Sequence, residues 1–188
     1  MKWVTCERPK IDRIACPWLI RRFIEEDAEF LYVPTERVFA VAAATGAVPY
    51  DIPGAEPYSH DGELCSFDAF LKQHDLDDPA LRRLAAIVRG ADTARLDLAP
   101  QAAGLLAISL GLSANYQDDH AMLEQGMVVY DALYAWCKDR QDETHNWTPA
   151  PAVPRRSAPR PRRRGSRAAA TRSPRGPAHR RAARGPRS

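Results

Sequence analysis

Residues 3–52 alternate between β-prone and helical segments, and this alternation constrains the fold most. The segments WVTC (3–6), EFLYV (29–33) and VPYDI (48–52) are short and typical of strands. Between them, residues 12–26 place apolar side chains at helical spacing, and residues 36–45 lie between a capping Thr35 and a stopping Gly46. Consecutive βαβ units follow this pattern. We therefore expect a small, mostly parallel three-stranded sheet.

The following stretch of the chain is predicted to be mainly helical. Ser66 is placed to cap a helix over residues 67–74, and Asp78-Pro79 indicates the start of a helix that Gly90 would end. Two further helices are expected over residues 100–112 and 118–140. The fold class is accordingly α/β or α+β, with a small sheet and a helix-rich C-terminal half.

The composition changes sharply at Pro149. Residues 151–188 contain 13 arginines and no acidic residue, which leaves 27 − 13 = 14 basic and 24 acidic residues, a net charge of 14 − 24 = −10, in residues 1–150. A segment of Arg, Pro, Ala, Ser and Gly cannot bury enough apolar surface to offset its ordering entropy. We predict a folded domain over residues 1–148 and a disordered basic tail over residues 149–188.

The tail admits more than one interpretation. Its arginines would bind nucleic acid through phosphate neutralisation, without sequence preference, because no aromatic side chain is present to stack on bases. It could also fold back on the acidic domain. Alternatively, the segment has no selected function and resembles the product of a shifted reading frame in GC-rich DNA.

The sequence lacks a membrane span, a signal peptide and paired cysteine motifs, and these features bear on cellular location and on the state of the cysteines. No apolar run approaches the roughly 20 residues of a membrane span, and MKWVTCERPKIDR carries charges where a signal peptide would be apolar. We therefore expect a cytoplasmic protein without a membrane segment. The four cysteines, Cys6, Cys16, Cys65 and Cys137, show no C-x-x-C spacing, which argues against a disulfide framework and a zinc ribbon.

The segment SHDGELCSFDAF (59–70) concentrates groups that bind metals. An imidazole, a thiol and carboxylates suit a divalent transition metal, and Asp92 could reach the same place from another helix. The candidate metal ligands are His60, Glu63, Cys65, Asp68 and Asp92. The pair His120 and Glu124, four residues apart, could also approach this site. In the alternative, this is a polar loop in which Cys65 is buried and Asp68 stabilises a helix N-terminus.

A second constellation lies at the predicted first helix. Arginine side chains match the geometry of tetrahedral oxyanions, and a helix N-terminus adds backbone donors. The candidate ligand-binding residues are Asp12, Arg13, Cys16, Arg21 and Arg22. In the alternative, the last two arginines are solvated or pair with Glu25 and Glu26. No catalytic residue is assigned, because the sequence contains no G-x-S-x-G, P-loop or dinucleotide-binding glycine motif.

Four separated motifs resemble a known family. KWVTCERPKIDRIACPWLIRRFIEEDAEFLYVP, HDGELCSFDAF, LAAIVRGADTARLDLAPQAAGLLAISLGL and GMVVYDALYAWC with ETHNW occur in the order found in the chromate-resistance ChrB family, in its C-terminal (chromate resistance exported protein) domain. The resemblance covers residues 1–148. The residues that match the family motifs are Asp12, Arg13, Trp18, Arg21, Arg22, His60, Gly62, Cys65, Phe67 and Asp92.

The resemblance implies a role in chromate resistance, with chromate or another small oxyanion as partner. Full-length members are chromate-responsive regulators; we expect their N-terminal regulatory domain to be absent here, so direct DNA binding is not implied. Arg89 stands where many relatives have histidine, which shifts the balance from metal towards anion binding. The leading hypothesis is a cytoplasmic accessory or sensor domain that binds an oxyanion or a metal at a site built from Asp12 and Arg13, the His60–Asp68 loop and Asp92. The alternatives are a hydrolytic or redox metalloenzyme and a nucleic-acid binder acting through the tail.

Overall fold

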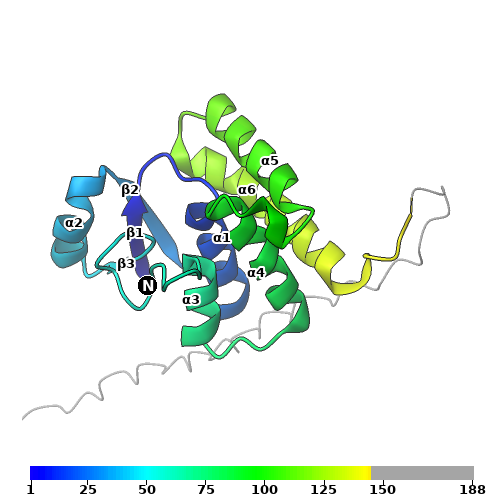
Figure 1. Ribbon diagram of the computed structural model, residues 1–188. Helices are drawn as coiled ribbons and strands as arrows, with labels where there is room; N and C mark the ends of the chain where they lie inside the picture. Colours follow the sequence, from blue (N-terminus) through cyan, green and yellow to red (C-terminus); the bar gives the residue numbers. More distant parts are fainter. Residues whose placement is uncertain (145–188) are drawn as a thin grey trace, which may run out of the picture. The chain divides into compact units, whose positions relative to one another are not determined.

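The computed structural model describes residues 1–144, in which a small parallel sheet is combined with six α-helices (Figure 1). The predictions of disorder and nucleic-acid binding for the basic tail fall on residues outside this range. The strands are β1 (Lys2–Cys6), β2 (Glu29–Val33) and β3 (Val48–Pro49). The α-helices are α1 (Asp12–Leu19), α2 (Val38–Thr45), α3 (Ser66–Gln73), α4 (Pro79–Asp92), α5 (Ala102–Asn115) and α6 (Asp119–Asp139).

The sheet confirms the predicted parallel arrangement. Its strand order is β2-β1-β3, and both neighbours of β1 run parallel to it, with Trp3 opposite Phe30 in β2 and opposite Val48 in β3. The third strand is shorter than predicted and ends at Pro49 rather than Ile52. The reason is local: Asp51 adopts a left-handed φ of 52°, which turns the chain out of the strand.

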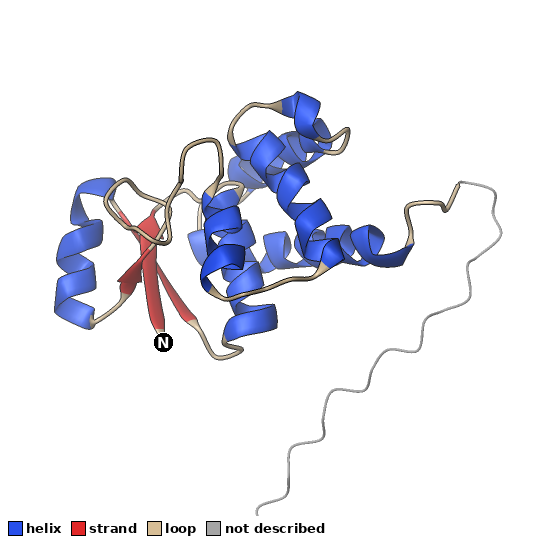
Figure 2. Ribbon diagram, turned by 60° about the horizontal axis from the view of Figure 1, so that its bottom comes forward, coloured by secondary structure: helices blue, strands red, loops and turns tan. Residues whose placement is uncertain are grey.

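Helices cover both faces of this sheet (Figure 2). Along β1, Val4 and Cys6 pack with Val38 of α2 on one face. Trp3 points to the opposite face and packs against Phe70 of α3. This alternation is the expected result of the two-residue repeat of a strand. The sheet is therefore doubly wound, with α2 on one face and the remaining helices on the other.

Helix α1 contains Pro17 at its sixth position, beyond the first turn in which proline is best tolerated. Proline has no N–H to donate to the carbonyl four residues earlier. That carbonyl, of Arg13, instead accepts a hydrogen bond of 3.0 Å from the Tyr32 hydroxyl on β2. The helix continues as a π-helical turn (Ile20–Ile24) and ends two residues before the predicted Glu26.

Helix α4 runs through Gly90 and ends at Asp92, so the prediction that Gly90 stops this helix is wrong. A Cβ at position 90 would lie 2.9 Å from the Cβ of Ala102 on α5. The glycine therefore permits the close approach of two helices instead of terminating one. The two additional residues matter because they carry Asp92 to the edge of the sheet.

The remaining connections are short. Single 3₁₀ turns precede α2 (Thr35–Arg37) and α5 (Leu96–Leu98), and Asp118 caps α6 by accepting a hydrogen bond of 2.7 Å from the Ala121 N–H. Across the described helices, none combines the length and apolar character needed to cross a membrane.

Candidate functional site

The site lies where strands β1 and β3 end. Asp12 opens α1 after the loop that follows β1, and Asp51 follows β3 by two residues. Because the carboxyl ends of parallel strands meet at one edge, these two carboxylates are brought together there. From β1 the chain winds first to β2 and then back to β3 on the other side. Ligands of doubly wound sheets bind at such a point of reversal.

Both aspartates are associated with unusual backbone. Asp51 has a φ of 52°, and Ile11, directly before Asp12, has a φ of 32°. For a β-branched residue a positive φ is a genuine outlier. Such conformations cost on the order of 1–3 kcal/mol each and cluster at functional sites. The backbone that follows β1 and β3 is therefore held in locally unfavourable conformations, as is common at functional sites.

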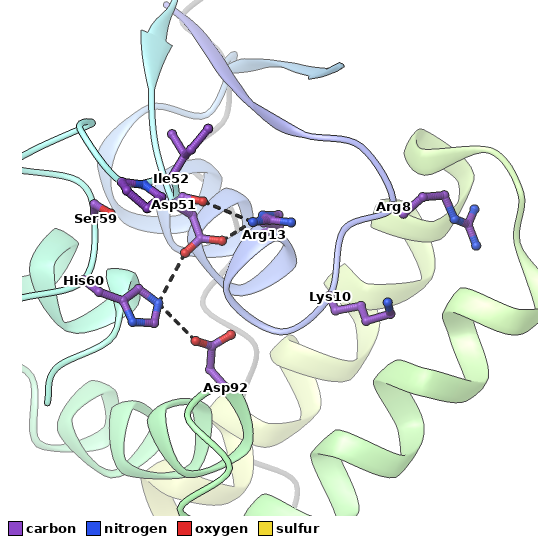
Figure 3. A pocket seen from close by; sticks show the side chains of 9 residues that line it. Arg8, Lys10, Arg13, Asp51, Ile52, Ser59, His60 and Asp92 are labelled. Atoms are coloured by element: carbon purple, nitrogen blue, oxygen red, sulfur yellow. Dashed lines mark hydrogen bonds and ion pairs between the residues drawn. The ribbon is translucent and has the colours of Figure 1, made fainter. Parts of the chain in front are cut away.

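His60, further along the β3–α3 loop that begins with Asp51, and Asp92, the last residue of α4, complete the cluster (Figure 3). His60 Nε2 lies 3.1 Å from Asp92 Oδ2, 3.5 Å from Asp51 Oδ1 and 3.8 Å from Asp12 Oδ2. One ligand atom each from Asp12, Asp51 and His60 lies within 4.8 Å of the others. This spacing is compatible with coordination of one metal ion.

Positive charge reaches the cluster mainly from Arg13. Its Nε lies 2.9 Å from Asp51 Oδ2, and its guanidinium also donates to the Asp51 carbonyl at 3.3 Å. His60 is the other group that can become cationic. Its interaction with Asp51 raises the pKa of His60, partial burial opposes this, and the charge of Asp92 adds to the increase. Three carboxylates therefore share one guanidinium and one imidazole.

Asp12 is the least compensated of the three carboxylates. It is fully buried, and within residues 1–144 its Oδ1 has no hydrogen-bond partner, while Oδ2 accepts one hydrogen bond of 3.2 Å from the Phe67 N–H. Burial, followed by the charges of Asp92 and Asp51, raises the pKa of Asp12 well above its ordinary value. Burial and the charge of Asp51 also raise the pKa of Asp92. A cation bound by the Asp12 carboxylate would relieve the repulsion among the three carboxylates and offset the cost of burying this charge.

The N-terminus of α3 supports the two central aspartates. The structure corrects the prediction that Ser66 caps this helix: Cys65 is the N-cap residue and Ser66 is the first helical residue. The Ser66 hydroxyl donates a hydrogen bond of 2.6 Å to Asp51 Oδ1, and the next residue, Phe67, donates its N–H to Asp12. Two consecutive residues thus orient two carboxylates from different strand ends.

A pocket of about 480 Å³ opens over the cluster. It is lined by Arg8, Lys10, Arg13, Asp51, Ile52, Pro53, Ser59, His60 and Asp92. Figure 3 shows Arg8 directed away from His60 and Asp92, and its guanidinium donates to the carbonyls of Ser113 and Tyr116. Lys10 makes no ion pair with any described residue. The pocket therefore combines an acidic floor with a basic wall.

Four of the residues that the sequence singled out converge here: Asp12 and Arg13 from the proposed oxyanion site, and His60 and Asp92 from the proposed metal site. The sequence offered them as two constellations, and its leading hypothesis joined Asp12 and Arg13, the His60–Asp68 loop and Asp92 in one site; the structure brings these four residues together. Asp51 was missed. The signal that could have found it is a carboxylate near the end of the predicted third strand (48–52), at the same sheet edge as the carboxylate that follows the first strand.

The two candidate cysteines are buried and do not line the pocket. Burial, and then the charge of Asp12, raises the pKa of Cys16 and also that of Cys65. Both side chains are consequently thiols at neutral pH, and a thiol is a much poorer metal ligand or nucleophile than a thiolate.

The remaining candidates lie elsewhere. Glu63 is exposed and lines a second pocket with Arg89 and Arg95. Asp68 pairs with Arg89 at 3.1 Å and accepts the Cys65 N–H at 3.2 Å, which is the helix-stabilising role of the alternative interpretation.

The two arginines of the π-helical turn that follows α1 are also engaged outside the pocket. Arg21 packs over the Phe30 ring and pairs with Glu124 at 3.6 Å. Arg22 forms a two-pronged pair with Asp131. Neither is paired with Glu25 or Glu26. His120 packs against Tyr32, so the pair His120 and Glu124 does not join the cluster.

The fold and site define a small doubly wound α/β domain with an aspartate- and histidine-rich centre at its strand-reversal point. Residues 3–137 match the family model described as ChrB, C-terminal domain. The chain belongs to this family, which confirms the resemblance noted from its motifs. It is 34% identical over 134 residues to Protein ChrB of Cupriavidus metallidurans strain CH34, an alignment that spans 71% of this chain and 40% of that protein. No solved structure matches the chain. Family membership supports a role related to chromate resistance.

Proposed function

We propose that this domain binds a divalent transition-metal ion between Asp12, Asp51 and His60, and that it serves chromate resistance in the cytoplasm as an accessory or sensor domain. The observation that carries the proposal is the fully buried carboxylate of Asp12: its Oδ1 has no hydrogen-bond partner among residues 1–144, and one of its oxygens lies within 4.8 Å of ligand atoms of Asp51 and His60. Buried polar atoms without partners are rare in proteins and call for a specific explanation. A bound cation supplies one here.

Charge favours a cation over an anion at the floor of the pocket. Asp12, Asp51 and Asp92 provide carboxylate oxygens, which are acceptors and repel an oxyanion at short range. Arg13 is already engaged with Asp51. A divalent ion would reverse the sign of the local charge and would stabilise the ionised form of all three carboxylates.

The donor set indicates which ions fit. Two carboxylates and one imidazole, with Asp92 as a possible fourth ligand, suit Mn²⁺, Fe²⁺ or Zn²⁺. Soft ions such as Cu⁺ prefer thiolates, whereas Cys16 and Cys65 are buried thiols and neither belongs to the group of three residues whose ligand atoms lie within 4.8 Å of one another. The proposal therefore keeps His60 and Asp92 of the sequence-based ligand set and replaces Glu63, Cys65 and Asp68 with Asp12 and Asp51.

A small oxyanion has a place in this arrangement above the ion. The pocket leads from solvent to the cluster, and Lys10 and Arg13 stand on its wall. An oxyanion such as chromate would bind to the ion as an additional ligand, and the Lys10 ammonium would balance its charge. A single site would then account for both metal binding and the chromate-related role of the family.

Metal analysis of the purified full chain tests the central claim. After incubation with Mn²⁺ and gel filtration, we expect close to one ion per wild-type chain and loss of that ion in Asp12→Asn and His60→Ala. Asp61→Asn is the matched control, because this residue neighbours His60 but its side chain is 72% exposed and pairs with Lys72. Wild-type protein that retains no Mn²⁺, Fe²⁺ or Zn²⁺ contradicts the proposal.

The oxyanion part has a separate test. Calorimetric titration with chromate should show binding to the metal-loaded protein, no binding after treatment with EDTA, and weaker binding in Lys10→Ala. If the EDTA-treated protein binds chromate with unchanged affinity, the anion is held by protein groups alone and the metal-bridged arrangement is wrong.

A metal-dependent enzyme is the second candidate, and Asp92 is the observation that favours it. This carboxyl group lines the pocket beside His60, and its pKa is raised by burial and by Asp51, as is typical of a general acid or base. A panel of chromogenic esters and phosphoesters would test for turnover. Under this hypothesis Asp92→Asn retains the metal but loses activity, and the absence of any metal-dependent turnover argues for the binding role.

A further inference from the structure

The turn that presents Asp12 is held from the helical half of the domain. Ile11, the residue before Asp12, has φ 32° and ψ −98° and is buried. An isoleucine does not keep this conformation unless its surroundings fix it, because its branched side chain clashes with the backbone there. Neighbouring groups must therefore hold the Ile11 backbone in this conformation.

Two buried side-chain hydrogen bonds meet at Ile11. Its N–H donates to Ser109 Oγ on α5 at 3.3 Å, and its carbonyl accepts from the Tyr130 hydroxyl on α6 at 3.1 Å. Both bonds are fully buried and join residues about a hundred positions apart in the sequence. The same carbonyl accepts the N–H groups of Ile14 and Ala15 in the first turn of α1.

A second strained residue of the same loop is anchored to the same helices. Arg8 has a φ of 57°, and its N–H donates to Asp119 Oδ2 at the start of α6 at 3.1 Å. Its guanidinium donates to carbonyls at the end of α5, among them that of Tyr116 at 2.9 Å. Arg8 and Ile11, the two positive-φ residues of this loop, are thus anchored to α5 and α6, while Glu7 at the start of the loop donates its N–H to Val33 of β2 at 2.8 Å.

We propose that Tyr130 and Ser109 are positioning residues for the ligand site. They act through the Ile11 peptide groups and fix the direction in which Asp12 enters the cluster. This inference rests on the proposed metal site. Groups that orient a metal ligand without touching the ion typically change metal affinity by about 10- to 100-fold when removed.

The chain offers a matched pair of variants. Tyr130→Phe removes one hydroxyl and leaves the ring beside Trp18, 6.2 Å between centroids. Tyr134→Phe removes a hydroxyl one turn further along α6, from a ring that also packs on Trp18 at 5.5 Å. The Tyr134 hydroxyl donates to Asp78 Oδ2 at the start of α4, away from the pocket. The two variants differ mainly in whether the lost bond leads to Asp12.

Co²⁺ is a suitable probe, because its visible spectrum reports coordination geometry. For the full chain we expect Tyr130→Phe to weaken Co²⁺ binding by about 10- to 100-fold and to change the visible bands. Tyr134→Phe should keep wild-type affinity and spectrum, even where thermal unfolding shows a similar loss of stability. Ser109→Ala should reproduce the effect of Tyr130→Phe and serves in its place if that variant does not fold.

The outcomes separate the two proposals. Wild-type affinity and spectrum in Tyr130→Phe, or in Ser109→Ala where that variant stands in, overturn the positioning role and leave the metal site intact. Equal losses in Tyr130→Phe and Tyr134→Phe also overturn it, because the effect is then general. A wild-type chain that does not bind Co²⁺ contradicts the metal site, and the positioning role falls with it.

Discussion

Asp68 lies in the first turn of α3, and Asp12 of α1 accepts an N–H from the same turn, yet the surroundings of the two carboxylates differ completely. Asp68 Oδ1 accepts from Arg89 at 3.1 Å, and Oδ2 accepts the Cys65 N–H at 3.2 Å. Asp12 accepts one N–H, leaves Oδ1 unpaired within the described chain and faces Asp51 and Asp92. A fully paired carboxylate supports the fold. A buried carboxylate that faces others of the same charge lowers stability, and is expected where function requires it.

The largest expected difference between the two residues is in metal binding. Asp12→Asn should weaken Mn²⁺ binding by about 100-fold or more, since a ligand to the ion is lost and ligand-supporting groups alone account for about 10- to 100-fold. Asp68→Asn should retain wild-type affinity. Isothermal titration of both variants makes the comparison directly. Equal losses in the two variants would place Asp68 in the site, as the sequence alone suggested.

The same contrast should appear in the metal's effect on unfolding. At a free Mn²⁺ concentration about 100 times the dissociation constant, a ligand that binds the native state adds about 2.7 kcal/mol to the free energy of unfolding. For a domain of this size this raises the melting temperature by about 5–10 °C. The increase should persist in Asp68→Asn and fall to about 0.4 kcal/mol or less in Asp12→Asn, whose binding is weaker by about 100-fold or more. Without metal, Asp12→Asn should be at least as stable as wild type, because it removes the repulsion from Asp51 and Asp92.

The role of Asp68 in folding predicts a loss of stability when its partner is removed. Arg89→Met leaves Asp68 Oδ1 without its donor in a side chain that is only 13% exposed, which should cost about 2 kcal/mol in urea unfolding. Arg95→Met is the control. Arg95 pairs with Asp97 on the surface, and such pairs contribute about 0–1 kcal/mol. A change in Mn²⁺ affinity in Arg89→Met would mean that Asp68 and the metal site are coupled.

These contrasts show how far the sequence led. The sheet was predictable, because β-prone segments alternate with helices in the first 52 residues. His60, Asp12 and Asp92 were recognised as candidates from their chemistry, but their convergence depends on β3 lying beside β1 and on α4 continuing past Gly90. Neither feature has a local signal. His60 and Asp68 were also assigned to one site because they are close in the sequence. Gly62, with a φ of 62°, turns the chain between them, so that His60 lies at the pocket and Asp68 lies in α3.

The smallest expected effect on stability concerns Asp131, another carboxylate that is paired in the folded state. Two hydrogen bonds from Arg22 and one of 2.8 Å from the Trp18 indole reach it. The interaction with Arg22 lowers the pKa of Asp131, partly opposed by burial. A carboxyl group whose pKa is lower in the folded state stabilises the fold above its ordinary value of about 3.9, and loses that contribution as the pH falls through the folded value.

Asp131→Asn should therefore lower the free energy of unfolding at pH 7 by about 1 kcal/mol or less, since the side chain is 46% exposed and screened by solvent. The difference from wild type should shrink as the pH is lowered below about 4 and disappear once the carboxyl is protonated in both states. Asp12 has a raised pKa, so replacing it has no such loss at neutral pH. A difference for Asp131→Asn that stays constant down to pH 2 would show that its charge does not contribute and that the geometry of its bond to Trp18 does.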